Sequence, residues 1–143
     1  MTMKRIAAVG FALLGLAGCG STATVPAGSS SASPSQAVVA LDEHADRTTV
    51  TVGVGTTIRV DLHSTYWSAV ASSAPQLVQP TGAPSSSASP SCRPGGGCGT
   101  VSSTFLARAA GSAQLTSQRS SCGEAKPCTS DQGTFTVTIK VTG

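Results

Sequence analysis

The chain has 143 residues, with nine Lys and Arg against six Asp and Glu, and only 10% of its residues are charged. One compact domain suits this length, and the weak positive charge excludes a strongly basic face, so no nucleic-acid partner is expected. Because aromatic residues make up only 3% of the chain, the core must consist mostly of Val, Leu, Ile and Ala. A small core of this kind gains from disulfides.

The first eighteen residues have the layout of a secretory signal. Lys4 and Arg5 form a short basic start, an apolar stretch follows over residues 6–14, and small residues come next. This apolar stretch is too short to span a bilayer as a permanent helix. The chain is therefore expected to be exported, and removal of the signal leaves it nearly neutral.

The stretch LAGC, residues 16–19, stands where the apolar stretch ends, and it resembles the bacterial lipobox. The resemblance implies that residues 1–18 are a lipoprotein signal peptide and that Cys19 carries acyl chains such as palmitate. Several acyl chains on one residue would anchor the chain stably on the extracytoplasmic side of the bacterial cell membrane. An ordinary cleaved secretory signal is the alternative.

After Cys19 the sequence up to residue 40 has no charge and no hydrophobic periodicity, which predicts a flexible Ser/Ala/Pro-rich tether over residues 19–40. The heptapeptide SSSASPS occurs at residues 29–35 and again at 85–91. Since Ser, Ala and Pro cannot build a core, we interpret the repeat as compositional and not as a duplicated structural unit. The second copy predicts a Pro/Ser-rich loop at about residues 79–91, and both copies could carry O-linked sugar.

The folded domain is expected over residues 41–143, where the hydrophobic pattern has the period of two that is typical of strands. Val50, Val52 and Val54, for example, are expected on one face, and a turn is expected at residues 53–55. The alternation predicts strands over residues 48–54, 57–62, 66–72, 100–109, 112–119 and 134–141, with a further fragment around 76–78. About seven short strands without a helical pattern favour an all-β fold, an immunoglobulin-like β-sandwich.

The other four cysteines form two groups with the same spacing, CRPGGGC at residues 92–98 and CGEAKPC at 122–128. Zinc sites favour two to four residues between paired cysteines, and an exported chain oxidises its thiols, so disulfides are favoured over a metal site. Local pairing of Cys92 with Cys98 and of Cys122 with Cys128 is the preferred interpretation, and crossed pairing between the two loops is the alternative. Local bridges would chiefly hold two surface loops in shape, and loops often carry binding.

The run from Val50 to Val141 resembles the chagasin-type inhibitors of papain-like cysteine peptidases. The shared features are the opening TVTVGVGTTIRVDL, the Thr-bearing turn HSTYW, and the Gly-rich PGGGCG ahead of TFLARAAGSAQLTSQR. Members of that family are immunoglobulin-like sandwiches in which three loops at one end form a wedge. The resemblance implies a binding surface composed of Thr65, Tyr66, Trp67, Gly95, Gly96, Gly97, Gly99 and Arg119.

The sequence departs from the family pattern at two of these loops. No Asn-Pro and no Gly accompany Thr65, and Arg119 is followed by Ser120 and Ser121, where the family has Pro and an aromatic residue. We therefore expect a lipid-anchored immunoglobulin-like binding or structural module of the cell envelope, with an unknown ligand. A chagasin-like inhibitor of papain-like cysteine peptidases is the alternative, so the expected partners are the membrane, through the lipid, and a peptidase or an envelope protein.

Some of these residues also have plainer interpretations. Trp67 has the size of a core residue, and Arg119 could pair with Glu124 or Asp131 at the surface. His44, in the acidic stretch LDEHADR, is interpreted as part of a solvated segment and not as a metal ligand. Because no nucleophile elbow, phosphate-binding loop or Ser-His-Asp set is visible in the sequence, we expect no enzyme, no catalytic residues, no metal and no cofactor.

Overall fold

The computed structural model describes residues 36–123 and 126–143, and the predicted signal peptide, Cys19 and most of the predicted tether lie outside the described residues. The described residues belong to one compact unit, Ser33–Gly143. They form nine strands and one short 3-10 helix: β1 Val38–Leu41, η1 Glu43–Ala45, β2 Thr49–Gly53, β3 Thr57–His63, β4 Ala71–Ser72, β5 Val78–Pro80, β6 Ser85–Ala88, β7 Gly99–Ala107, β8 Gly111–Gln118 and β9 Thr134–Thr142. No helix among them is long and apolar enough to cross a membrane.

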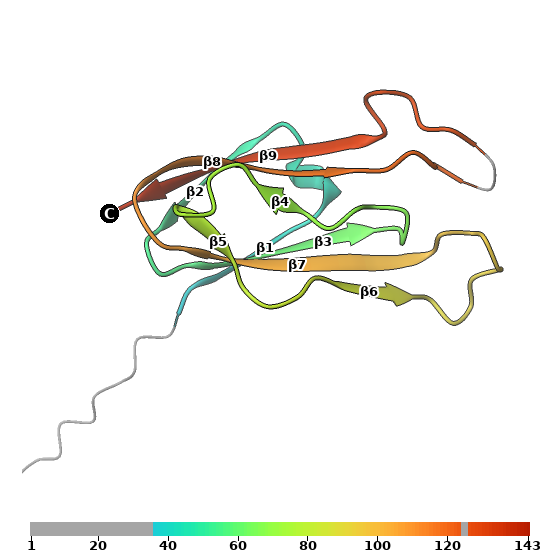
Figure 1. Ribbon diagram of the computed structural model, residues 1–143, viewed down its shortest axis with the longest axis horizontal. Coiled ribbons are helices and arrows are strands. Elements are labelled where there is room, and N and C mark those ends of the chain that lie inside the picture. Colours follow the sequence, from blue (N-terminus) through green and yellow to red (C-terminus); the bar gives the residue numbers. More distant parts are fainter. Residues whose placement is uncertain (1–35, 124–125) are drawn as a thin grey trace, which may run out of the picture. The chain divides into compact units, whose positions relative to one another are not determined.

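The strands form two sheets that pack as a sandwich, which confirms the predicted all-β fold (Figure 1). One sheet has the order β1-β3-β7-β5, with β6 also paired to β7, and the other has the order β2-β9-β8-β4. β1 pairs with β3 and β2 pairs with β9 in parallel, and the remaining pairs are antiparallel. The long strands β3, β7, β8 and β9 therefore give both sheets their framework.

The core lies between the sheets and follows the predicted alternation. In β3, the side chains of Ile58, Val60 and Leu62 are buried while Arg59 is exposed. Facing residues of β9 are buried in the same alternating manner. The core cluster consists of Val52, Ile58, Val60, Leu62, Trp67, Val70, Val78, Val101, Phe105, Ala107, Ala113, Leu115, Phe135, Val137, Ile139 and Val141. All of these residues lie within Ser33–Gly143, so this segment carries its own core.

Two predicted boundaries were wrong because each segment pairs with a neighbouring strand; β1 also packs its half-buried Val39 and Leu41 against the core, whereas β6 has no buried face. The first strand begins at Val38, inside the predicted tether, where β1 pairs with β3. Within the predicted Pro/Ser-rich loop, Ser85–Ala88 form strand β6, whose four residues are all exposed. β6 pairs with the part of β7 that lies beyond β5, so an unpaired edge of β7 organises a segment that has no hydrophobic pattern.

The predicted strand over residues 66–72 was also wrong for most of its length, since only Ala71–Ser72 pair with β8. The amide of Ser68 still donates to Gln118 O at 2.8 Å, and the amide of Val70 donates to the Ser103 hydroxyl at 3.2 Å. This segment therefore bonds to β8 of one sheet and to β7 of the other, instead of pairing along a single strand. Val54 also differs from its predicted place, because β2 ends at Gly53 and Val54, in the following turn, is 51% exposed.

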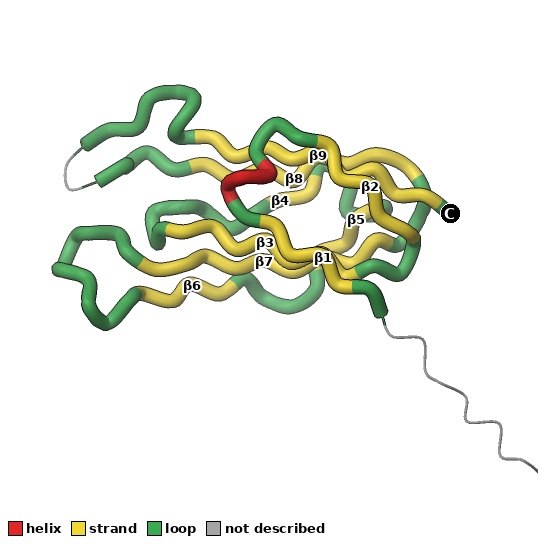
Figure 2. Tube along the Cα trace, turned by 180° about the vertical axis from the view of Figure 1, so that it is seen from behind, coloured by secondary structure: helices red, strands yellow, loops and turns green. Residues whose placement is uncertain are grey.

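Three connections lie at the same end of the sandwich, away from the C-terminus (Figures 1 and 2). They are residues 64–70 after β3, residues 89–98 between β6 and β7, and residues 119–133 between β8 and β9, of which 124 and 125 are outside the description. We call them the first, second and third loops, and together the loop end. The β2–β3 and β7–β8 turns lie at the opposite end.

Candidate functional site at the loop end

A hollow of about 420 Å³ brings the three loops together at the loop end. It is lined from the end of β3 and the first loop by His63, Ser64 and Tyr66, from the second loop and the start of β7 by Gly96, Gly97, Cys98 and Gly99, and from the third loop by Arg119, Cys122 and Gly123. A second hollow of about 580 Å³ lies between the first and third loops, and Tyr66 and Arg119 line both. These two side chains are therefore central to the surface.

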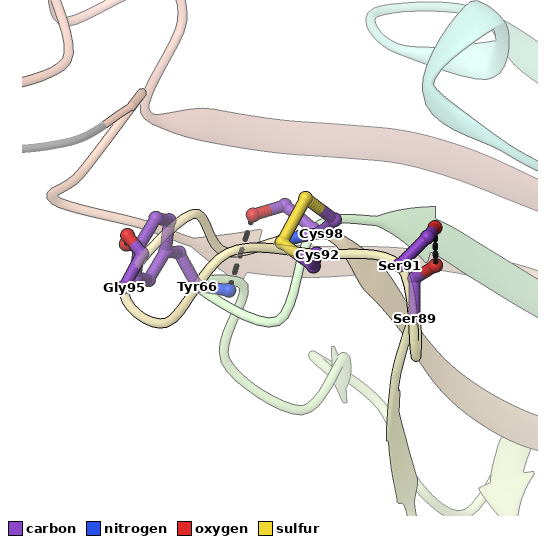
Figure 3. Close-up of a disulfide and its surroundings, with 7 residues drawn as sticks. Tyr66, Ser89, Ser91, Cys92, Gly95 and Cys98 are labelled. Atoms are coloured by element: carbon purple, nitrogen blue, oxygen red, sulfur yellow. Dashed lines mark hydrogen bonds between the residues drawn. A yellow bond between two sulfur atoms is a disulfide. The ribbon is translucent and has the colours of Figure 1, made fainter.

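The first two loops are bonded directly to one another. The amide of Thr65 donates to Gly97 O at 2.8 Å, and the Tyr66 hydroxyl donates to Gly95 O. Figure 3 shows Tyr66 beside Gly95, with the Cys92–Cys98 bridge further along the same loop. Thr65 and Gly95 do not line the hollow, so their place in the site is to hold its walls together.

Gly97 and Gly99 allow the close approach of the first loop to the second. A Cβ atom on Gly97 would lie 2.2 Å from Tyr66 Cε2, and the φ angle of Gly97 is +66°, a conformation that favours glycine. A Cβ atom on Gly99 would lie 2.8 Å from Thr65 Cγ2 and 2.1 Å from Ser87 O. The Gly-rich stretch therefore has a packing reason, which is contact with the two residues of the Thr-bearing turn.

Both disulfides in the structure are local, the favoured of the two pairings that the spacing left open. Cys92 pairs with Cys98 at a Cα–Cα distance of 5.6 Å, and Cys122 pairs with Cys128 at 4.9 Å. Cys92 Sγ also accepts the amide of Cys98 at 3.1 Å. Each bridge thus closes a loop at the loop end, and disulfides of this kind persist in oxidising compartments, which fits an extracytoplasmic location.

Trp67 and Arg119 form a stacked pair at the mouth of the core. Trp67 is 6% exposed and belongs to the core cluster, in agreement with its plainer interpretation. Arg119 Cζ lies 4.4 Å from the centre of the Trp67 ring, and its Nε donates to Gln132 O at 3.1 Å. In the described structure Arg119 forms no ion pair with Asp131. The cation–π contact therefore orients the guanidinium group of a half-buried arginine toward both hollows.

Ser68 attaches the first loop to the end of β8 and was not recognised in the sequence. Its hydroxyl accepts the amide of Gln118 at 3.1 Å, and its carbonyl accepts the Ser117 hydroxyl at 2.7 Å. Because Gln118 directly precedes Arg119, these bonds fix the first loop against the start of the third. Serine is so common in this chain that no sequence signal distinguishes Ser68.

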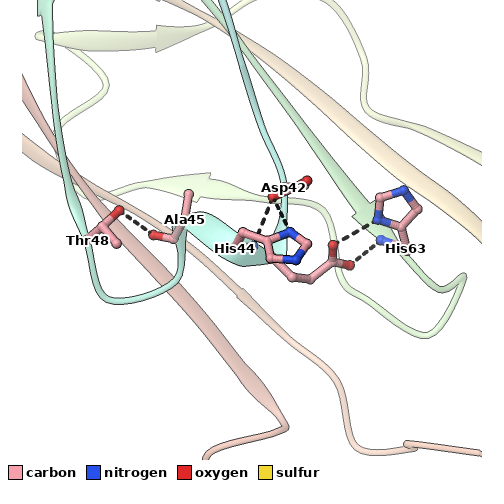
Figure 4. Close-up of polar contacts among 6 residues, drawn as sticks. Asp42, His44, Ala45, Thr48 and His63 are labelled. Carbon is pink, nitrogen blue, oxygen red and sulfur yellow. Dashed lines mark hydrogen bonds and ion pairs between the residues drawn. The ribbon is translucent and has the colours of Figure 1, made fainter.

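A contact between η1 and the end of β3 borders the hollow (Figure 4). Glu43 accepts the backbone amide of His63, and its Oε2 lies 2.8 Å from His63 Nδ1. This hydrogen bond and the negative charge of Glu43 raise the pKa of His63 above its ordinary value. Neither residue was expected in the site, because they are far apart in the sequence, although His63 has the exposed position that strand alternation gives it.

In the acidic stretch before β2, His44 is solvated as expected, with a side chain that is 94% exposed, whereas Asp46 accepts the backbone amide of Thr136 at 2.7 Å. Asp42 caps η1 by accepting the amide of His44 at 2.9 Å, and this bond lowers the pKa of Asp42. Among residues 36–123 and 126–143, no three His, Cys, Asp or Glu side chains are grouped so that they could hold a metal ion. The described loop end instead offers hydrogen-bonding groups, an arginine and an aromatic ring, a combination that suits recognition of another protein.

No protein-family model and no curated protein matches the chain. Among solved structures, the crystal structure of the cysteine protease inhibitor EhICP2 from Entamoeba histolytica matches with a TM-score of 0.55 at 13% identity, covering 77% of this chain and 100% of the inhibitor. The solution structure of amebosin matches with a TM-score of 0.50 at 18% identity, covering 74% of this chain and 98% of amebosin. At these identities the likeness establishes the fold, which this chain shares with a cysteine protease inhibitor.

Proposed function

We propose that the chain is an exported inhibitor of papain-like cysteine peptidases, and that its loop end occupies the groove of the target. The observation that carries the proposal is the convergence of three loops around one hollow, on a fold that a cysteine protease inhibitor also has. The envelope-module interpretation has no comparable support. The inhibitor interpretation, which was the alternative from sequence, is therefore the better of the two.

The bonds within the loop end suit an inhibitor because a stiff surface loses little entropy on binding. The first loop is bonded to the second through Thr65 and Tyr66, and to β8 through Ser68. The two disulfides restrict the second and third loops further. Most of the ordering that binding would require is therefore already present in the free chain.

The second loop would also resist cleavage by the peptidase that it occupies. Peptidases bind a substrate as an extended segment, and six residues in extended form span about 20 Å. The Cα atoms of Cys92 and Cys98 are six residues apart in sequence but only 5.6 Å apart in space. The bridge thus prevents this loop from adopting a substrate-like conformation.

A titration of residues 33–143 against papain tests the proposal. We expect stoichiometric loss of peptidase activity, and weaker inhibition by an Arg119→Ala variant. Val54→Ser is the matched control, since Val54 is exposed at the opposite end of the sandwich and its replacement should leave inhibition unchanged. Full papain activity at a large excess of the folded wild-type chain would reject the proposal.

A further inference from the structure

We propose that the Cys92–Cys98 disulfide is an exchangeable bond, and that the reactive cysteine of a bound peptidase opens it to form a mixed disulfide with Cys98. This inference rests on the proposed function and adds a covalent step to it. The nucleophile that it needs is the thiolate that cysteine peptidases maintain at low pKa for their own reaction. The chain would then hold its target by a bond that reductants release.

The position of the two sulfur-bearing residues selects the point of attack. Cys98 is exposed and lines the hollow shared by the three loops, whereas Cys92 is half-buried and does not line it. A Cβ atom on Gly96 would lie 2.8 Å from Cys92 Sγ and 3.5 Å from Cys98 Sγ, so the sulfur of Cys92 is packed more closely against Gly96 than the sulfur of Cys98. Since exchange depends on which sulfur a thiolate can reach, attack is expected at Cys98.

The hydrogen bond at Cys92 favours its departure. Its Sγ accepts the amide of Cys98 at 3.1 Å, and a donor at this position stabilises negative charge on sulfur. A sulfur whose developing negative charge is stabilised in this way leaves faster in thiol–disulfide exchange. Exposure of Cys98 and charge stabilisation at Cys92 thus favour the same direction of opening.

The exchange balances without an outside oxidant. The partner's thiolate attacks Cys98 Sγ, a new S–S bond forms, and the Cys92–Cys98 bond breaks with its electron pair on Cys92 Sγ. The partner's sulfur is oxidised to the disulfide level, and Cys92 is reduced to a thiolate. Because Cys92 remains close in the same loop, it can attack the mixed disulfide and restore the original bridge, so capture is reversible.

The second bridge provides an internal control. Cys122 also lines the hollow, but both Cys122 and Cys128 are half-buried. If exposure decides the exchange, this bridge should remain intact while Cys92–Cys98 opens. A general sensitivity of the chain to thiols would open both bridges.

The experiment mixes residues 33–143, the segment that carries its own core, with active papain and quenches the mixture with N-ethylmaleimide. Peptides from a non-reducing digest should show papain's catalytic cysteine joined to Cys98 and maleimide on Cys92. Attachment at Cys92, Cys122 or Cys128 would overturn the inference. Papain with its catalytic cysteine replaced by alanine should bind without forming an adduct.

Size-exclusion chromatography of the same mixtures distinguishes failure of the exchange from failure of the proposed function. A non-covalent complex with the alanine form of papain, together with no adduct from the active form, would reject the exchange and leave the proposed function standing. If neither form makes a complex, the proposed function fails and the exchange fails with it.

A pair of variants tests the direction of opening independently. In Cys92→Ser, Cys98 is capped with thionitrobenzoate, and in Cys98→Ser the same cap is placed on Cys92. Active papain should release thionitrobenzoate about tenfold faster from Cys98 than from Cys92, because exchange follows access to the sulfur. Equal rates, or faster release from Cys92, would contradict the proposed geometry.

Discussion

At Gly97 the backbone of the second loop passes against the ring of Tyr66, with a φ angle of +66°. A Gly97→Ala substitution should therefore impose both a left-handed conformation on alanine and a collision with the ring. We expect it to lower the free energy of unfolding by about 1–3 kcal/mol, measured by chemical denaturation. Inhibition should weaken as well, because the first loop would lose its support.

Gly95→Ala is the matched control, since Gly95 has a φ angle of +79° but nothing within 4 Å of a Cβ atom. It imposes the same kind of backbone strain without the collision. Gly97→Ala should therefore be the more harmful of the two. Equal effects of both substitutions would show that contact between Tyr66 and Gly97 does not hold the loops together.

The contact between Glu43 and His63 makes the stability of the chain depend on pH. The pKa of His63 is higher in the folded chain than its ordinary value of about 6.5, because the Glu43 carboxylate accepts a hydrogen bond from the protonated His63 ring and carries a negative charge. A raised pKa means that the stabilisation is fully present below about pH 6.5 and is lost as the pH rises through the folded value. His63 is largely exposed, so the effect should be modest.

Urea denaturation of the wild type and of Glu43→Gln at several pH values measures this dependence. Glutamine keeps an oxygen that can accept the backbone amide of His63 but removes the charge. The difference in unfolding free energy between the two chains should be larger at pH 5.5 than at pH 8. A difference that grows as the pH rises would contradict the contact.

At the scale of the loops, each disulfide closes a short ring of chain. Loop-closure entropy predicts that the Cys92→Ser/Cys98→Ser double variant loses about 2 kcal/mol of stability and remains folded. The amide of Thr65 bonds to Gly97 O inside this bridge, so its hydrogen exchange should quicken. Cys122→Ser/Cys128→Ser is the matched variant and should leave that amide protected. Global unfolding of either variant in native buffer would show that the sandwich depends on its bridges.

Strands were predictable where one face of the segment is buried. β3, β8 and β9 follow the alternation because Ile58, Leu115 and Val137 must face the other sheet. β6 was missed because its exposed serines are held by backbone bonds to β7 alone. Residues 66–70 misled the prediction because Trp67 fills the core from a loop and not from a strand.

The site could be predicted only where side chains act through a recognisable local pattern. The Gly-rich stretch and Arg119 were identified through family resemblance, and the structure brings them to one hollow. Glu43 and His63 were missed because they are partners of one another at a separation of 20 residues in sequence. Ser68 was missed because its partners, residues 117 and 118, are about 50 residues away. A single sequence carries no signal for such pairs.

For the whole molecule, we propose that lipid on Cys19 holds the sandwich at the outer face of the cell membrane. Residues 1–35 lie outside the described structure, so the proposal rests on the LAGC stretch. The native protein should sediment with membranes, and Cys19→Ala should release it or leave the signal uncleaved. An unmodified mature N-terminus in mass spectra of the native protein would contradict lipidation.

We propose that the three loops at one end of the sandwich form a single surface that binds a papain-like peptidase. Amide hydrogen exchange of residues 33–143, alone and with papain, tests it most directly. We expect slower exchange in the complex at residues 64–67, 93–99 and 118–123, and unchanged exchange in the β2–β3 and β7–β8 turns at the opposite end. Protection confined to those turns, or no protection anywhere at saturating papain, would contradict it.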